Sequence, residues 1–149
     1  MCGACPGGAA VPRLTAYANL TGITAEVTTV LQRAAGNRVR VTRFADRWLL
    51  RSRTGAQSVA ADLEQVAGHL VRHGAVDWAG LGTSTAIGVD VDPDGRTRSC
   101  PYDAELRRIE SVPARHVRPT LTASQFAVAL LVRAGNSAVA RKETPAALS

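Results

Sequence analysis

Residues 37–55, NRVRVTRFADRWLLRSRTG, contain two short runs in which apolar and polar side chains alternate. A period of two is typical of a β-strand that buries one face and exposes the other. Ala45-Asp46 separates the two runs and fits a tight two-residue turn, and Gly55 fits the end of the second run. The stretch therefore predicts a β-hairpin, which needs helices to cover its apolar face.

The flanking segments have the apolar spacing of three and four residues that is typical of amphipathic helices. Gly22 is expected to divide the first of these helices into two parts. Ser58 is expected to cap the second helix, and Gly74 to end it. The expected helices are residues 14–35, 58–73, 103–109 and 122–133.

The last expected helix has the clearest start signal. Thr122 and Gln125 fit a capping box, in which each side chain bonds to the backbone N–H of the other residue. The helix is expected to end near Arg133, because Gly135-Asn136 is a typical helix exit.

Residues 90–102, DVDPDGRTRSCPY, begin like the loop of a calcium-binding EF-hand. Such a loop needs a carboxylate at its twelfth position, where this chain has Pro101. Asp-Pro-Asp-Gly is also the pattern of a four-residue turn, and the flanking residues alternate like strands. The stretch therefore predicts a second hairpin over residues 85–100, with Asp92 facing Arg96 and Asp90 facing Arg98.

Together these segments predict a single α+β domain, with an antiparallel sheet from two β-hairpins covered by amphipathic helices. The domain is expected to span residues 13–142, between a flexible arm at 1–12 and a frayed tail at 143–149. The longest apolar run, residues 126–132, is too short to cross a bilayer, and the first residues do not resemble a signal peptide. We therefore expect a cytoplasmic protein that does not contact membranes.

The positive charge of the chain is concentrated in the first hairpin. The net charge is +6, and residues 38–53 contain six arginines against one aspartate. The two-residue turn places Arg40 opposite Arg51, and like charges in such a pair destabilise a hairpin. Phe44 and Trp48 lie close by and could stack on bases. We therefore expect nucleic acid or another polyanion to bind Arg38, Arg40, Arg43, Arg47, Trp48, Arg51 and Arg53.

The cysteines and histidines raise a second hypothesis. Cys2 and Cys5 have the spacing of half a zinc site, and His69 and His73 lie one turn apart on the expected helix 58–73. These residues could hold zinc or an iron–sulfur centre. Alternatively, the histidines only interact with the dipole at the C-terminal end of the helix.

The helix expected at residues 122–133 is apolar around much of its circumference. It is either a central core helix or a surface that docks on a larger protein, which would make this chain an accessory or assembly subunit. No serine–histidine–aspartate set and no supported pair of catalytic carboxylates stands out in the sequence. We therefore expect a binding protein rather than an enzyme, with no required cofactor.

Overall fold

The computed structural model describes residues 12–78, 90–91, 97–99, 102–111 and 121–143. These residues form an α+β fold with a three-stranded and a two-stranded antiparallel sheet, which confirms the predicted fold class. The helices are α1 (Arg13–Thr21), α2 (Thr24–Ala35), α3 (Leu63–Arg72), α5 (Asp103–Ser111) and α6 (Ala123–Glu143). The strands are β1 (Val39–Phe44), β2 (Arg47–Ser52), β3 (Gln57–Ala60), β4 (Asp90–Val91) and β5 (Thr97–Ser99).

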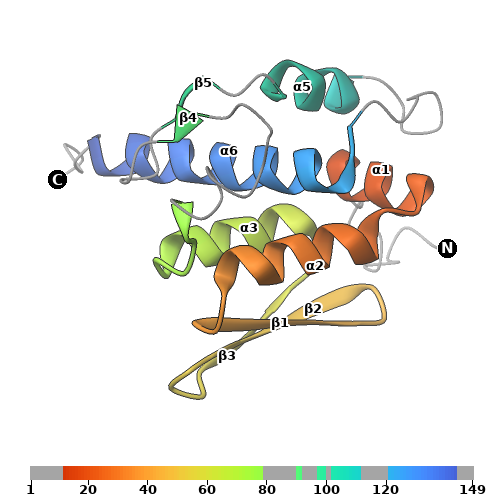
Figure 1. The fold of residues 1–149 in the computed structure, drawn as a ribbon. Coiled ribbons are helices and arrows are strands. Elements are labelled where there is room, and N and C mark those ends of the chain that lie inside the picture. The colour runs from red at the N-terminus through yellow and green to blue at the C-terminus, as the bar shows by residue number, and fades with distance from the viewer. Residues whose placement is uncertain (1–11, 79–89, 92–96, 100–101, 112–120, 144–149) are drawn as a thin grey trace, which may run out of the picture.

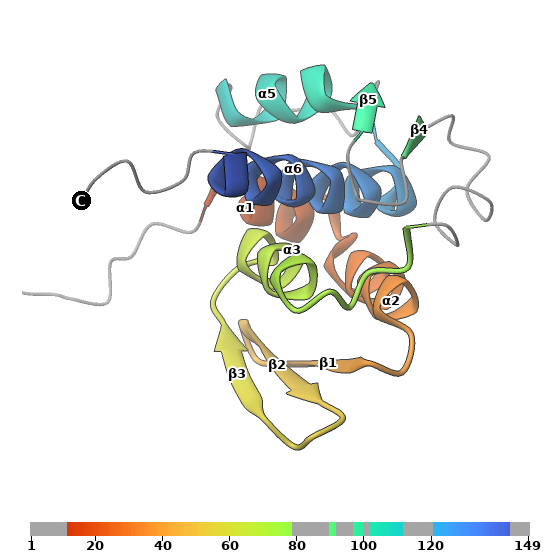
Figure 2. The same ribbon diagram turned by 90° about the vertical axis from the view of Figure 1, so that its left-hand side faces the viewer.

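The elements are stacked in layers. The sheet β1-β2-β3 forms the lowest layer in Figure 1, and α2 and α3 lie directly above it. α6 packs on the other side of α2 and α3, and α5 lies beyond α6 (Figure 2). The described helices therefore all lie on one side of the three-stranded sheet.

Gly22 separates α1 from α2, as the sequence predicts. Its φ of +73° lies in the left-handed region, which glycine enters without the strain of a Cβ atom. The N–H of Ile23 then donates to the carbonyl oxygen of Ala18 at 3.0 Å and closes the end of α1.

The first predicted hairpin is also confirmed. Ala45-Asp46 joins β1 to β2, and Ala45 adopts a φ of +51° in this turn. Arg40 pairs with Arg51 in the register that the sequence predicts. The hairpin is extended by β3, which pairs antiparallel with β2 and makes β2 the central strand.

The helix predicted at residues 58–73 is wrong at its start. Residues 57–60 form β3, so Ser58 does not cap a helix. Asp62 caps α3 instead, because its carboxylate accepts a hydrogen bond from the N–H of Gln65 at 2.8 Å. The side-chain oxygen of Gln65 accepts a hydrogen bond from the N–H of Ala61 at 3.0 Å. This reciprocal arrangement resembles a capping box and fixes the start of α3.

The second predicted hairpin corresponds to β4 and β5, which form a separate two-stranded sheet. The two hairpins therefore do not share one sheet. Asp90 pairs with Ser99 rather than with Arg98, because the register shifts by one residue next to Asp90. The predicted Asp92–Arg96 pair lies outside the described residues.

The capping box at the start of α6 is confirmed. The N–H of Gln125 donates to Oγ1 of Thr122 at 3.2 Å, and the N–H of Thr122 donates to Oε1 of Gln125 at 3.0 Å. The predicted end near Arg133 is wrong, because α6 continues through Gly135-Asn136 to Glu143. A glycine inside a helix costs about 1 kcal/mol relative to alanine, which the packing of α6 against its neighbours outweighs.

α6 is the central helix of the core. The side chains of residues 126–132 are all buried, and α6 packs against both α2 and α3. The burial of these side chains fits the core-helix alternative, and docking of helix 122–133 on a partner protein stays a prediction. Of the helices in the described ranges, none combines the length and the apolarity needed to cross a membrane.

We predict that Asp62→Ala destabilises the protein more than Ser58→Ala does. Loss of a helix cap costs about 0.5–2 kcal/mol, and Asp62 provides the cap of α3. Urea unfolding followed by circular dichroism measures both free energies. An equal loss in the two variants would contradict the observed helix start.

Candidate nucleic-acid interface

The two faces of the three-stranded sheet differ in burial and in charge. The face toward α2 and α3 is apolar and includes the buried residues Val39, Val41, Trp48, Leu50 and Ala60. The opposite face, called the open face below, points away from the described helices (Figure 2). It is formed by Arg40, Thr42, Phe44, Arg47, Leu49, Arg51, Gln57 and Val59.

The side chains of the open face form three rows that run across the strands. Successive rows are two residues apart along each strand, or about 7 Å. The outer rows carry the arginines, and the middle row has no charged side chain. No aspartate or glutamate belongs to any of the rows. The rows are Arg40–Arg51–Gln57, Thr42–Leu49–Val59 and Phe44–Arg47.

Large apolar side chains are exposed on this face. Phe44 is 50% exposed and Val59 is 53% exposed, while Leu49 is half-buried between their strands. Burial of apolar surface is worth about 25 cal/mol per Å², so these side chains are stabilised when another molecule covers them. Exposed apolar groups that are grouped on one face are typical of a binding site.

The paired arginines impose an electrostatic cost on the same face. Arg40 and Arg51 lie directly opposite each other, where Cβ atoms are about 5 Å apart. Within the described ranges, neither guanidinium group lies within salt-bridge distance of a carboxylate. A bound anion between the two side chains would reduce their repulsion.

The remaining predicted arginines lie elsewhere. Arg38 precedes β1, and its Nη1 donates to the carbonyl oxygen of Gly74 at 2.9 Å, which links the sheet to the end of α3. Arg43 lies over the ring of Trp48, 6.0 Å from the ring centroid. Arg53 lies in the turn between β2 and β3. The structure therefore brings together Arg40, Arg47 and Arg51, but not all of the predicted set.

Trp48 is not available for base stacking, which corrects the prediction. It is 1% exposed, and its Nε1–H donates to Oγ1 of Thr28 on α2 at 3.0 Å. Phe44 is the exposed aromatic residue of the hairpin. The alternation of the sequence contains this information, because Trp48 is in phase with the buried Leu50.

The contribution of β3 to the open face was not predicted from the sequence. Gln57 and Val59 join the rows from β3, next to Arg51 and Leu49. The alternation of apolar and polar side chains at residues 57–60 covers only 4 residues, too few to identify a strand. Val59 also fits the helical spacing of apolar residues that continues into α3. The helix cap at Asp62 is the sequence signal that shows the helix beginning after residue 62, and residues 57–60 lying outside it.

The hypothetical metal site is only partly within the described residues. Cys2 and Cys5 lie outside them. The rings of His69 and His73 lie side by side with centroids 4.1 Å apart, and Oγ of Ser58 lies 3.2 Å from Nδ1 of His69. The described part of the chain contains no group of three or more metal-ligating side chains, so these histidines have no third ligand there.

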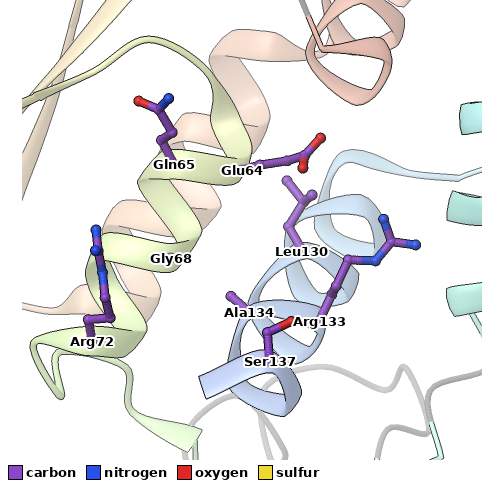
Figure 3. Close-up of a pocket in the computed structure, with 8 residues that line it drawn as sticks. All are labelled: Glu64, Gln65, Gly68, Arg72, Leu130, Arg133, Ala134 and Ser137. Carbon is purple, nitrogen blue, oxygen red and sulfur yellow. The ribbon is translucent and has the colours of Figure 1, made fainter. Parts of the chain in front are cut away.

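A pocket of about 330 Å³ lies between α3 and α6 (Figure 3). Glu64 points from α3 toward α6, and burial raises its pKa, with the carboxylate of Asp62 adding to the effect. Arg133 is hydrogen-bonded to Glu110 and lies 3.5 Å from Asp103, so protein carboxylates already neutralise its charge. The open face is therefore the stronger candidate for binding an anion.

Comparisons of the chain with protein-family models, with curated proteins and with solved structures found no match.

We predict that His69 titrates below its ordinary pKa of about 6.5. Burial lowers the pKa of His69, and the neighbouring His73 and Arg72 lower it further. The folded state therefore prefers the neutral ring, and its stability falls as the pH drops from the ordinary pKa through the lowered one. An NMR titration of the His69 ring protons measures this pKa, and His73→Ala should raise it.

A pKa of His69 at or above the ordinary value would contradict the packing of the two rings. The packing of the two rings would also be contradicted if His73→Ala left the pKa of His69 unchanged.

Proposed function

We propose that this protein binds single-stranded nucleic acid on the open face of its three-stranded sheet. The observation that carries the proposal is a solvent-facing sheet surface with Arg40, Arg47, Arg51 and the half-exposed Phe44 but no carboxylate. Arginines bind phosphates and release their counterions, which makes binding dependent on salt. Phosphate contacts carry no sequence information, so we expect little preference among sequences.

A single strand fits this face better than a duplex does. The bases of a single strand are free to cover apolar side chains and to stack on an aromatic ring. A duplex presents mainly phosphates and sugars to a broad sheet face, and would leave Phe44, Leu49 and Val59 against charged groups. The exposed apolar side chains between the arginines therefore favour unpaired bases.

The pairing of Arg40 with Arg51 supports the same reading. Two like charges that face each other on neighbouring strands destabilise a sheet by about 0.2–1 kcal/mol. Arg40 and Arg51 form such a pair on the surface, and no carboxylate of the described residues neutralises it. A phosphate group between the two guanidinium groups turns this repulsion into two attractive contacts. The repulsion is then a property of the unbound protein only.

We predict that Arg40→Ala with Arg51→Ala weakens binding to oligo(dT) and makes it less sensitive to salt. Each neutralised phosphate contributes about 0.7 to the slope of log K against log salt for a single strand, so losing the phosphate shared by Arg40 and Arg51 should reduce the slope by about 0.7. Fluorescence anisotropy over a series of salt concentrations measures the slope.

The matched control is Arg107→Ala with Arg108→Ala, which removes the same charge from α5 on the far side of the helices from the sheet (Figure 1). This control should retain most of the affinity and of the slope. An equal loss in both double variants would mean that only the net charge matters. A wild-type protein that binds no oligo(dT) at low salt would refute the proposed function.

We also predict that Phe44→Ala weakens binding to oligo(dT) by about 1–3 kcal/mol, the usual contribution of one stacked base. Binding to inorganic polyphosphate, which has no bases, should change little, because the arginines remain. Phe44→Tyr should retain the affinity for oligo(dT). The stacking contact would be ruled out if Phe44→Ala had the same effect on both polyanions.

A further inference from the structure

The two edges of the three-stranded sheet differ in how their backbone groups are bonded. β1 forms one edge, and its outward groups are bonded by the side chain of Gln32 on α2. Nε2 of Gln32 donates to the carbonyl oxygen of Val39 at 3.0 Å, and Oε1 accepts from the N–H of Val41 at 2.6 Å. The amide of Gln32 thus replaces a peptide group of a neighbouring strand and closes part of this edge.

β3 forms the other edge, and its outward backbone groups are open. The N–H of Ser52 on β2 donates to the carbonyl oxygen of Ala56. Every second residue from there, namely Ala56, Ser58 and Ala60, therefore directs its backbone groups toward β2. The backbone N–H and C=O groups of Gln57 and Val59 therefore point outward. No hydrogen bond joins these groups to another residue in the described ranges.

β3 also lacks the features that usually protect an edge strand. Proteins commonly place a charge, a proline or a bulge on such a strand to prevent pairing with another chain. The sequence of β3, QSVA, contains no charge and no proline, and Val59 is 53% exposed. The charges lie on the central strand instead, at Arg47 and Arg51. An uncharged edge with free backbone groups is suited to the addition of a strand.

We propose that two copies of this protein pair through β3, antiparallel and related by a two-fold axis, when they bind the same nucleic-acid strand. This inference rests on the proposed function. Pairing Ser58 with Ser58 of the second copy sets Gln57 opposite Val59 twice, and each of these pairs can exchange two backbone hydrogen bonds. The two open faces then join into one surface.

Charge favours a second copy as the occupant of this edge. Because β3 is uncharged, self-pairing sets no charged side chain of β3 against another. Arg51 of one copy and Arg51 of the other are three strand spacings apart, about 14 Å across the strands, and are also offset by about 7 Å along them. This distance exceeds the screening length of about 8 Å at physiological salt, so their repulsion is weak.

The size of the edge explains why pairing requires the nucleic acid. β3 has 4 residues, and a contact along it buries much less than the roughly 1,200 Å² that stable interfaces need. Two copies on one nucleic-acid strand have an effective concentration on the order of millimolar. A contact that is too weak in free solution can then form, which makes binding to long strands cooperative.

Val59→Pro and Val59→Ala test the proposal as a matched pair. Both variants lose the same apolar side chain, but only proline removes the outward N–H, and an edge strand tolerates proline at such a position. Binding is measured on oligo(dT) of about 8 and about 30 nucleotides, which hold one and several copies. Wild type and Val59→Ala should bind the long strand cooperatively, with about tenfold or more tighter binding per site than on the short one. Val59→Pro should bind both lengths with the same affinity per site.

Hydrogen exchange on the wild-type protein provides a measurement without a variant. The amides of Gln57 and Val59 should gain protection on the long strand and not on the short one. Cooperativity that survives in Val59→Pro, or that is also lost in Val59→Ala, would overturn pairing through the β3 backbone. Binding to the short strand without cooperativity on the long one would refute self-pairing alone, while no binding to the short strand would refute the proposed function.

Discussion

The burial of Trp48 fixes which face of the sheet meets the helices. Its indole ring is 1% exposed, and its Nε1–H is bonded to Thr28 on α2, so β2 has one orientation relative to the helices. Because side chains alternate along a strand, Arg47 and Leu49 must then point to the other side. Their partners on β1 and β3 follow through the register. The composition of the open face is therefore a consequence of the packing of one aromatic side chain.

The same packing requires a core that covers only one face of the sheet. α2 and α3 fill the space above the sheet, and α6 fills the space above them with side chains that are buried around most of its circumference. The described helices provide no layer for the opposite face. Apolar side chains such as Phe44 and Val59 remain in solvent there, next to arginines that lack carboxylate partners among the described residues.

The parts of the fold that were predictable from the sequence are those set by local chemistry. The break at Gly22, the turn at Ala45-Asp46 and the capping box of Thr122 each depend on a few neighbouring residues. The Arg40–Arg51 pair followed from the turn alone. These features are determined before any long-range packing is considered.

The features that were missed depend on tertiary structure. Residues 57–60 fit a helix as well as a strand until β2 is available to pair with them. Gly135 is a normal helix exit unless the preceding turns are held in the core. The candidate site was therefore predictable in its hairpin arginines. Its third strand was not assigned, and the burial of Trp48, which was expected to stack on bases together with Phe44, was not foreseen.

The bond between Gln32 and the edge of β1 has a consequence for the size of any assembly. A sheet with two open edges can add chains without limit and form fibres, whereas a sheet with one open edge can add only one neighbour. With part of the β1 edge closed by Gln32, β3 is the more open edge, and a two-fold contact through it limits the growth of the sheet. A side-chain amide on α2 thus favours a self-limiting pair over a polymer.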